Sequence, residues 1–350
     1  MPYLLKYTIK RVLLMLLSTF IILTITFFLM KLLPDPPISG TIVAQNAYCQ
    51  DQVSQGYYLV FNSEQTGLGR TIIPPYTDPT GMTFFYYRRP IIEQYFAWLR
   101  GIFTRWDWGT SSSIQRQTGA IELIGARLVP TISINVFALI ISLPLGFIFG
   151  IIAALNKNKP TDHIISTIVM IFISVPSFVI ISLLMLGLSY STGWLPSSWP
   201  INGSPISAYA QAMVIPVLSL CFGTIAAFTR YTRAELCEVM SSEFLLLART
   251  KGLNKRQCVI RHALRNSLVP LVPMIIGQFI GILGGSVVLE QLYGIQGIGR
   301  LFVEAIKGSD YNVLLADMAI FTMISLAASL LVDLSYGIVD PRIRMGAKAS

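Results

Sequence analysis

Long runs of about twenty mainly apolar residues recur along this chain, and they restrict its possible folds more than any other feature. A helix needs about 20 such residues to cross the hydrocarbon core of a bilayer. Six runs have roughly this length, at residues 12–33, 128–155, 164–190, 212–229, 268–289 and 313–337. The sequence therefore predicts an all-α polytopic membrane protein with six transmembrane helices.

The composition agrees with a membrane protein and argues against several soluble classes. Hydrophobic residues make up 53% of the 350 residues and charged residues only 12%, whereas soluble domains contain about 25% charged residues. The net charge of +9 is not gathered into basic segments with interleaved aromatic residues, as a single-strand-binding groove requires. The four cysteines form no CxxC pair and the two histidines lie far apart, so we expect no metal site.

The distribution of Lys and Arg predicts which side of the membrane each loop occupies, because cytoplasmic loops are enriched in both residues. With the N-terminus inside, the inside segments are 1–11, 156–163, 230–267 and 338–350. They hold 16 basic residues, whereas the two short outside loops hold only two. We therefore expect a multi-pass protein with both its N- and C-termini in the cytoplasm.

The sequence indicates four parts along the chain. These are an N-terminal tail with the first transmembrane helix (1–33), an extracytoplasmic cap (34–122), a core of five transmembrane helices (123–340) that contains the cytoplasmic loop 230–267, and a cytoplasmic tail (341–350). Trp98, Trp106 and Trp108 of the cap segment lie either at the lipid interface or in the core of the cap itself.

The longest inside segment is predicted to form a chain of short helices. Thr232 and Glu235 have the spacing of a capping box, which would begin a first helix. Ser241 or Ser242 is placed to cap a second helix, and Asn254 to begin a third.

The second of these helices is predicted to be amphipathic. Phe244, Leu247, Ala248 and Lys251 recur at helical spacing and would share one face. Gly252 follows at the position where a left-handed residue ends a helix. Because the segment is too hydrophobic for simple solvation, we expect it to dock on another protein or on the membrane surface.

Several motifs carry a resemblance to a known family. Two of them lie in the loop: Ala248-Arg-Thr-Lys-Gly-Leu and His262-Ala-Leu-Arg-Asn-Ser-Leu-Val-Pro. Another, Arg127-Leu-Val-Pro-Thr-Ile, lies at the start of the second span. The last two are Leu289-Glu-Gln-Leu-Tyr-Gly-Ile-Gln-Gly-Ile-Gly-Arg after the fifth span and Leu331-Val-Asp-Leu-Ser-Tyr-Gly-Ile-Val-Asp-Pro-Arg at the end of the sixth. The loop resembles the cytoplasmic EAA loop of ABC-transporter permeases. In order and spacing, the set resembles the first-permease, B-type subunit of the oligopeptide/dipeptide permease family.

The resemblance implies a fold, a function and a set of partners. It implies the type I ABC importer permease fold and a pore-forming subunit, in a bacterial cell (cytoplasmic) membrane, that takes up oligopeptides or dipeptides. A homologous second permease, two cytoplasmic P-loop ATPase subunits and an extracytoplasmic peptide-binding protein would assemble with it in the lipid bilayer. The residues that would couple the chain to the ATPase are Phe244, Leu247, Ala248, Arg249, Lys251, Gly252, His262 and Arg265.

The chain departs from the family pattern at a few positions. Leu246 and Leu247 replace an acidic residue and an alanine of the loop motif, and Arg265 replaces its terminal proline. Gln296 stands where the family usually has proline. No GxxxxGK[ST] motif occurs, so we expect this chain not to be an enzyme and to hold no cofactor, with ATP and Mg bound by the partner ATPase subunits.

Three polar residues at membrane depth are candidates for the translocation path. Asn135 and Gln278 must find hydrogen-bond partners in the bilayer, either across helices or along the path. Asp333 is costly at depth and usually functional. It lies about one turn from the cytoplasmic end of its span, where water or a nearby Arg would also satisfy it.

A tandem GxxxG pattern marks the fifth predicted span. Gly277, Gly281 and Gly285 recur every four residues. Such small residues let two helices approach closely, so we expect them to serve helix packing rather than to line a pore.

Other kinds of membrane protein remain as alternatives. The same architecture would serve import of nickel or another small solute. A secondary transporter independent of ATP usually has several ionisable residues at mid-membrane, and here only Asp317 and Asp333 lie within the predicted spans. An intramembrane enzyme is disfavoured because neither histidine lies within a span.

Overall fold

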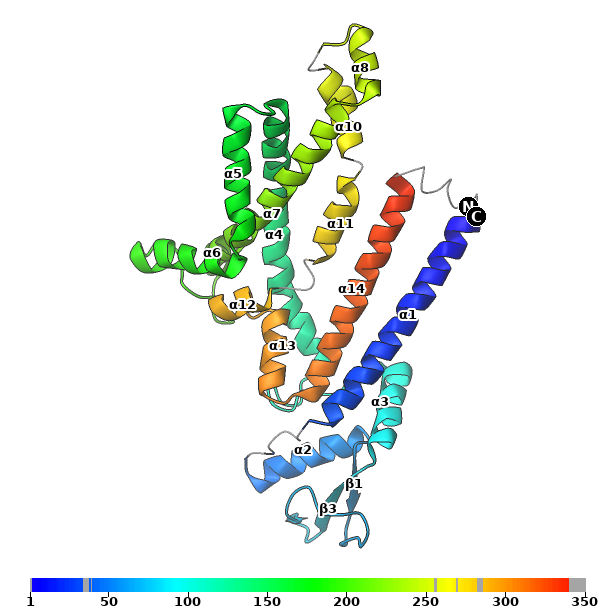
Figure 1. Ribbon diagram of the computed structural model, residues 1–350. Helices are drawn as coiled ribbons and strands as arrows, with labels where there is room; N and C mark the ends of the chain where they lie inside the picture. Colours follow the sequence, from blue (N-terminus) through cyan, green and yellow to red (C-terminus); the bar gives the residue numbers. More distant parts are fainter. Residues whose placement is uncertain are drawn as a thin grey trace. The chain divides into compact units, whose positions relative to one another are not determined.

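The computed structural model describes residues 2–33, 38, 40–254, 257–268, 270–281 and 286–339, and it consists mainly of helices (Figure 1). The predicted tail at 341–350 lies outside the described residues. The chain divides into two compact units. The core unit comprises Met1–Met15, Arg127–Arg300 and Met323–Ser350, and the cap unit comprises Leu16–Ala126 and Leu301–Thr322.

Four of the described helices are long and apolar enough to cross a membrane. They are α1 (Pro2–Lys31), α4 (Ala120–Leu155), α7 (Ile206–Met240) and α14 (Tyr311–Val339). Only 22% to 50% of the residues in their most apolar stretches are buried within the chain, so much of the apolar surface faces outward. A surface of this kind requires lipid or another protein around it. The prediction of an all-α polytopic membrane protein is confirmed.

The predicted span 164–190 is not one straight helix. α5 (Pro160–Ser174) is followed by α6 (Ser177–Leu184), which continues as the π-helix η1 (Met185–Ser191), and the chain bends by 97° between them. The bend occurs at Pro176, which has no amide hydrogen to donate and forces the preceding residue out of the helical region. Val175 accordingly has extended backbone angles, with φ −94° and ψ 117°.

The predicted span 268–289 is described only in part. α11 covers Leu271–Gly281, residues 282–285 lie outside the described part, and α12 covers Val287–Tyr293. The described residues therefore contain four spans, or five if the bent pair counts as one. The fifth predicted span, 268–289, stays a prediction.

The core unit is centred on a cluster of buried apolar side chains from four elements. Ile134 of α4, Ile181 of α6, Ile215 of α7, and Leu289 and Tyr293 of α12 are at most 2% exposed and pack in this cluster. Burial of such side chains stabilises the fold by roughly 1.5–3 kcal/mol each.

Two glycines of α4 make a close crossing with α7 in the core unit. A Cβ atom on Gly146 would lie 2.7 Å from the Cβ atom of Phe228, and one on Gly150 would lie 2.5 Å from that of Thr232. The Thr229 hydroxyl donates a hydrogen bond to the Gly146 carbonyl oxygen at 3.3 Å. Gly146 and Gly150 thus form a GxxxG contact with α7, one that our sequence analysis missed.

The glycines predicted to serve helix packing are in a different situation. A Cβ atom on Gly277 would lie 3.7 Å from Val332 of α14, which is an ordinary van der Waals distance. The contact does not require glycine there. Gly281 ends α11, and Gly285 lies outside the described residues.

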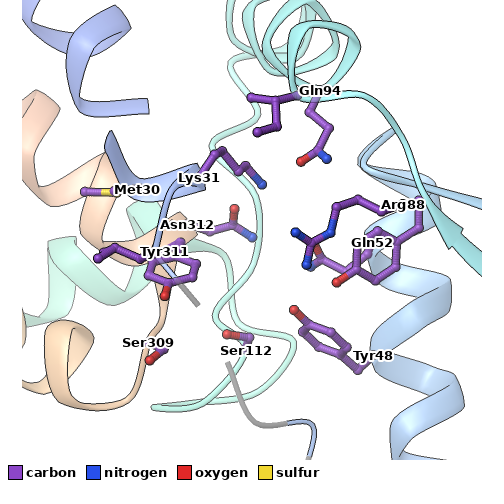
Figure 2. Close-up of a pocket in the computed structure, with 13 residues that line it drawn as sticks. Met30, Lys31, Tyr48, Gln52, Arg88, Gln94, Ser112, Ser309, Tyr311 and Asn312 are labelled. Carbon is purple, nitrogen blue, oxygen red and sulfur yellow. The ribbon is translucent and has the colours of Figure 1, made fainter. Parts of the chain in front are cut away.

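The cap unit contains a small antiparallel sheet. Its strands are β1 (Tyr58–Phe61), β2 (Tyr76–Thr77) and β3 (Thr83–Arg88), in the order β1-β3-β2. α2 (Ile42–Ser54) packs on β1 and β2, and α3 (Ile91–Arg105) follows β3. Several of these elements surround the pocket in Figure 2.

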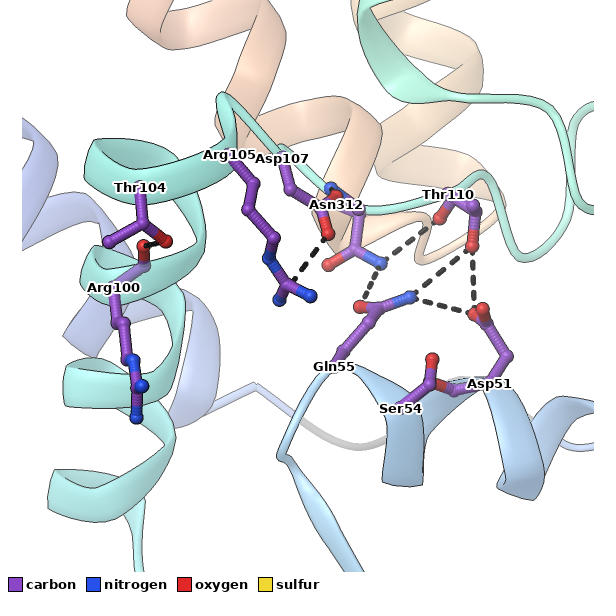
Figure 3. A network of polar contacts seen from close by, with 10 residues as sticks. Asp51, Ser54, Gln55, Arg100, Thr104, Arg105, Asp107, Thr110 and Asn312 are labelled. Atoms are coloured by element: carbon purple, nitrogen blue, oxygen red, sulfur yellow. Dashed lines mark hydrogen bonds and ion pairs between the residues drawn. The ribbon is translucent and has the colours of Figure 1, made fainter.

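A polar network joins α2 to Asn312, near the start of α14, within the cap unit (Figure 3). The Gln55 amide donates to Asp51 at 2.7 Å and to the Thr110 hydroxyl at 3.2 Å, and the Asn312 amide donates to Gln55 at 2.9 Å. The Asp310 carboxylate accepts from the Ser111 hydroxyl at 2.6 Å and from three successive backbone amides. These bonds hold the loop after α3 in place.

The three tryptophans of the cap have different environments. Trp98 and Trp108 are 5% exposed and belong to the core of the cap, whereas Trp106 is 60% exposed. Of the two alternatives for these residues, the buried core is therefore right for Trp98 and Trp108. Cys49 is also fully buried, and burial raises the pKa of its thiol to about 12.

Candidate functional site

The predicted coupling loop begins within a helix. α7 continues without a break from Ile206 to Met240, so Thr232 and Glu235 lie in its interior. The helix start predicted at Thr232 is wrong, because the hydrogen bonds of the spanning helix continue past it. The Thr232 side chain instead lies at the crossing with Gly150.

Two serines form the turn between α7 and α8 (Glu243–Thr250). The Ser241 and Ser242 hydroxyls donate to the carbonyl oxygens of Glu238 at 2.8 Å and Val239 at 2.6 Å. They therefore satisfy carbonyl groups at the end of α7, where helices leave such groups without partners. One of these side chains was predicted to cap the start of the second helix, whereas these two bonds are made at the end of α7.

The helix α8 has one buried face and one exposed apolar face. Leu245 is fully buried and Ala248 is 8% exposed, and both pack in a cluster with Leu236 of α7. Phe244, at 43% exposed, and Leu247, at 57%, remain accessible. The residues predicted to share one face therefore lie on two sides of α8. Contact with α7 buries Ala248 together with Leu245, whereas Phe244 and Leu247 stay exposed.

Gly252 ends α8 as predicted. Its φ is +86°, in the left-handed region that glycine adopts without strain. The Leu253 amide donates to the Ala248 carbonyl oxygen at 3.4 Å, which is the long bond of a Schellman motif. Leu253 also packs in the cluster beneath α8, so the turn returns the chain to the buried side.

The third helix begins at Asn254 as predicted. The Asn254 side chain accepts from the Gln257 amide at 2.8 Å, and the Gln257 side chain accepts from the Asn254 amide at 3.1 Å. This reciprocal pair is a capping box. The chain continues as the π-helix η2 (Cys258–Ala263) and then α10 (Leu264–Ser267). His262 is half-buried, and the side chains of Arg249 and Arg265 lie outside the described part.

An ion pair connects α5 to α7 beside this loop. Arg233 binds Asp162 with two bonds, Nε to Oδ1 at 2.6 Å and Nη2 to Oδ2 at 2.8 Å. Asp162 is 1% exposed and also accepts from the Asn158 amide at 3.0 Å. Removing one partner of a buried pair leaves an uncompensated charge. The sequence offered no spacing signal for this pair, since its members are 71 residues apart.

The three candidate path residues have different environments. The Asn135 amide donates to the Thr131 carbonyl oxygen of its own helix at 2.8 Å, so this bond is not one across helices. Gln278 is exposed on α11. Asp333 forms an ion pair with Arg11 at 2.9 Å, which confirms that a nearby Arg satisfies it.

A buried glutamate organises the loop after α12. Glu290 is 2% exposed, and its carboxylate accepts from the Thr131 hydroxyl at 2.8 Å and from the Arg300 amide at 2.9 Å. Burial raises the pKa of this carboxyl group, and the hydrogen bonds oppose the shift. A Cβ atom on Gly297 would lie 2.4 Å from the carboxylate, and one on Gly299 would lie 3.1 Å from it.

The loop therefore needs glycine where its backbone passes the buried carboxylate. Sequence reasoning missed this role, although the glycine spacing after Glu290 was visible. Gln296, which departs from the family pattern, accepts a hydrogen bond from Arg127. The described residues contain no group of three or more His, Cys, Asp or Glu side chains that could hold a metal ion.

Comparison with known proteins agrees with this geometry. Residues 146–345 match the family of binding-protein-dependent transport system inner membrane components. The dipeptide transport system permease protein DppB of Lactococcus lactis is 33% identical over 97% of this chain and 99% of its own length. The oligopeptide transport system permease protein OppB of Haemophilus influenzae is 30% identical over the same shares.

Solved structures share the fold at lower identity. The MetNI methionine ABC transporter, in an inward-facing conformation, aligns with a TM-score of 0.51 and 16% identity, over 63% of this chain and 97% of that one. An amino acid ABC transporter aligns with a TM-score of 0.50 and 17% identity, over 62% of this chain and 94% of that one.

The fold and the helical loop define a multi-pass membrane protein with the type I ABC importer permease fold. The chain belongs to the family of binding-protein-dependent transport system inner membrane components, as a permease subunit of its dipeptide and oligopeptide transport group.

Proposed function

We propose that the chain forms half of a pore through which dipeptides or oligopeptides enter the cell, driven by ATP hydrolysis in partner chains. The names of the relatives support peptides over nickel or another small solute. The observation that carries the coupling is the exposed apolar face of α8, with Phe244 and Leu247 accessible on a helix that the chain itself holds firmly.

The proposed partners follow from the family. A homologous permease completes the pore, two cytoplasmic P-loop ATPase subunits bind ATP and Mg, and an extracytoplasmic peptide-binding protein delivers cargo. The family description, which names dependence on a binding protein, supports the last of these. The excess of basic residues in the inside segments supports a cytoplasmic position for both termini.

The packing of α8 suggests how movement would pass from the ATPase to the membrane. Leu245 and Ala248 attach α8 to α7 and η2 through one apolar cluster. A force applied to Phe244 or Leu247 would therefore move the end of a spanning helix rather than a flexible loop. Arg249, Lys251, His262 and Arg265 remain proposed contacts, and Gly252 acts by fixing the turn.

Among the proposed path residues, Gln278 retains the clearest case. Its amide is exposed on an apolar helix, whereas Asn135 and Asp333 already have partners within the chain. A polar side chain exposed at membrane depth needs water, substrate or another chain.

Paired substitutions on α8 test the coupling. Leu247→Ser removes an exposed contact and should change stability by no more than about 0.5 kcal/mol, yet it should abolish peptide uptake and reduce ATPase recovery in a pull-down. Leu245→Ala removes a buried contact and should destabilise the chain by about 2–5 kcal/mol.

The assay uses proteoliposomes that contain the whole transporter, with labelled dipeptide outside and ATP inside. Phe244→Ser should reproduce the effect of Leu247→Ser, and Tyr231→Ser, an exposed change on α7, serves as the control. Normal uptake by both Phe244→Ser and Leu247→Ser would refute the role of this face.

A further inference from the structure

A small polar pocket lies within the cap unit, at the end of the first spanning helix. It has a volume of about 30 Å³, enough for about two water-sized groups. Side chains from α1, α2, β1, β3, α3 and α14 and from three loops line it (Figure 2). The permease function described above assigns it no role.

The pocket is positively charged. Figure 2 shows Lys31 and Arg88 pointing into it from opposite sides. No carboxylate is found among the described residues that line it, and its other polar groups are hydroxyls and amides, including those of Tyr48, Gln52 and Gln94. Lys and Arg surrounded by hydroxyl and amide donors are the typical ligands of a phosphate group.

The pocket lies at the depth of lipid headgroups. Lys31 is the last residue of the span Thr8–Lys31, which has 24 residues. At 1.5 Å per residue the span is about 36 Å long, slightly more than the hydrocarbon core of about 30 Å. The ammonium group of Lys31 therefore reaches the level of the phosphates on the cap side of the membrane.

The helix α3 extends this surface with an apolar stripe. Ile92, Phe96, Phe103 and Trp106 recur at helical spacing and are 52% to 76% exposed. The opposite face of α3 is attached to the spanning helix, where the hydroxyl groups of Tyr95 and Thr24 lie 2.8 Å apart and the Trp98 ring lies 5.1 Å from that of Phe27.

The spanning helix α1 also has apolar side chains that face outward, such as Leu29, which is 59% exposed. Ile91, at the start of α3, also lines the pocket. A helix with one apolar face and an exposed Trp at its end is typical of segments that lie in the membrane interface.

We propose that the pocket receives the two charged phosphate oxygens of an anionic phospholipid, with Lys31 and Arg88 bound to these oxygens and the acyl chains along the α3 stripe. Free phosphate presents the same charged group. Only a lipid also accounts for the exposed apolar side chains that begin at the rim of the pocket.

Native mass spectrometry of the full chain in mild detergent tests the site. Phosphatidylglycerol, phosphatidylcholine and inorganic phosphate are added separately at equal concentration, and inorganic phosphate is then added at the same concentration to the chain with phosphatidylglycerol bound. We expect retention of phosphatidylglycerol and weaker retention of phosphatidylcholine, whose choline cation opposes the site. Lys31→Gln and Arg88→Gln should each weaken phosphatidylglycerol binding about tenfold. Lys31→Arg should retain it, and Arg70→Gln, an exposed cap residue outside the pocket, is the matched control.

A second measurement needs no change in the pocket. Trp194 is also exposed, at 78%, so the measurement uses a Trp194→Phe background. Brominated phosphatidylglycerol should quench the fluorescence of this variant, and most of that quenching should disappear when Trp106→Phe is added. Unaltered lipid binding by both glutamine variants, or complete displacement of the lipid by an equal concentration of inorganic phosphate, would overturn the proposal. Absence of quenching in the Trp194→Phe background would overturn the position of α3.

Discussion

At the scale of single residues, backbone geometry identifies the glycines that matter. Gly252 has φ +86° with open space around it, so only its conformation demands glycine. Gly297 is required for lack of space instead, since a Cβ atom there would meet the Glu290 carboxylate at 2.4 Å. Proline is equally dependent on context, because Pro130, Pro144 and Pro216 lie within continuous helices whereas the chain bends at Pro176.

Substitutions at Gly252 test whether peptide uptake requires the left-handed backbone conformation of this residue. A residue with a Cβ atom in the left-handed region costs about 1–2 kcal/mol, and Asn less than others. Gly252→Asn should therefore keep most peptide uptake, and Gly252→Pro should abolish it, because proline fixes φ near −65°. Uptake in proteoliposomes is measured together with the amount of each variant inserted in the membrane. Equal uptake by the two variants would show that the left-handed turn is unimportant.

At the scale of elements, α4 and α7 approach each other closely in the core unit. Gly146 and Gly150 bring the two backbones together, and Thr229 adds a hydrogen bond to the Gly146 carbonyl. The ion pair between Arg233 and Asp162 holds α5 to the same helix α7. α7 therefore connects the membrane core to the helix α8 that we propose contacts the ATPase.

A methyl group at this crossing should be destabilising. Gly150→Ala places a Cβ atom 2.5 Å from that of Thr232 and 2.9 Å from the Thr229 carbonyl oxygen. Overpacking of this kind costs about 1–3 kcal/mol, so thermal unfolding in detergent should begin at a lower temperature. Gly223→Ala, on α7 with nothing within 4 Å, is the control and should leave stability equal or slightly higher. A Gly150→Ala variant as stable as that control would contradict the tight crossing.

At the scale of the whole molecule, the chain has the features of a subunit rather than of a complete transporter. Much of the surface of its spanning helices is apolar and exposed, and the α8 face is accessible. Lipid would cover part of this surface and a second permease another part, while the ATPase would cover α8. The proposed pore is therefore completed by other chains.

A gentle detergent pull-down of the tagged chain should recover this assembly. We expect two P-loop ATPases, a second polytopic permease and a peptide-binding protein, identified by mass spectrometry. The binding protein would then reveal the cargo by the ligand that it retains. Recovery of the chain alone, with solute transport in proteoliposomes that lack ATP, would favour a secondary transporter instead.

Local signals in the sequence were sufficient for several features. Apolar run length identified the four spanning helices α1, α4, α7 and α14. Gly252 at the end of α8 and Asn254 before η2 were recognised because turns depend on nearby backbone geometry. The division of α8 into a buried and an exposed face was not visible, because Phe244, Leu245, Leu247 and Ala248 are all compatible with either face.

The sequence by itself determined that this is a polytopic membrane protein and, through its motifs, which permease family it belongs to. Both depend on composition and order along the chain. The tertiary structure alone decided which residues meet across long separations, such as Arg233 with Asp162 and Glu290 with Thr131. Pairing of this kind depends on how helices pack, and packing is set by the simultaneous fit of many side chains that no local pattern records.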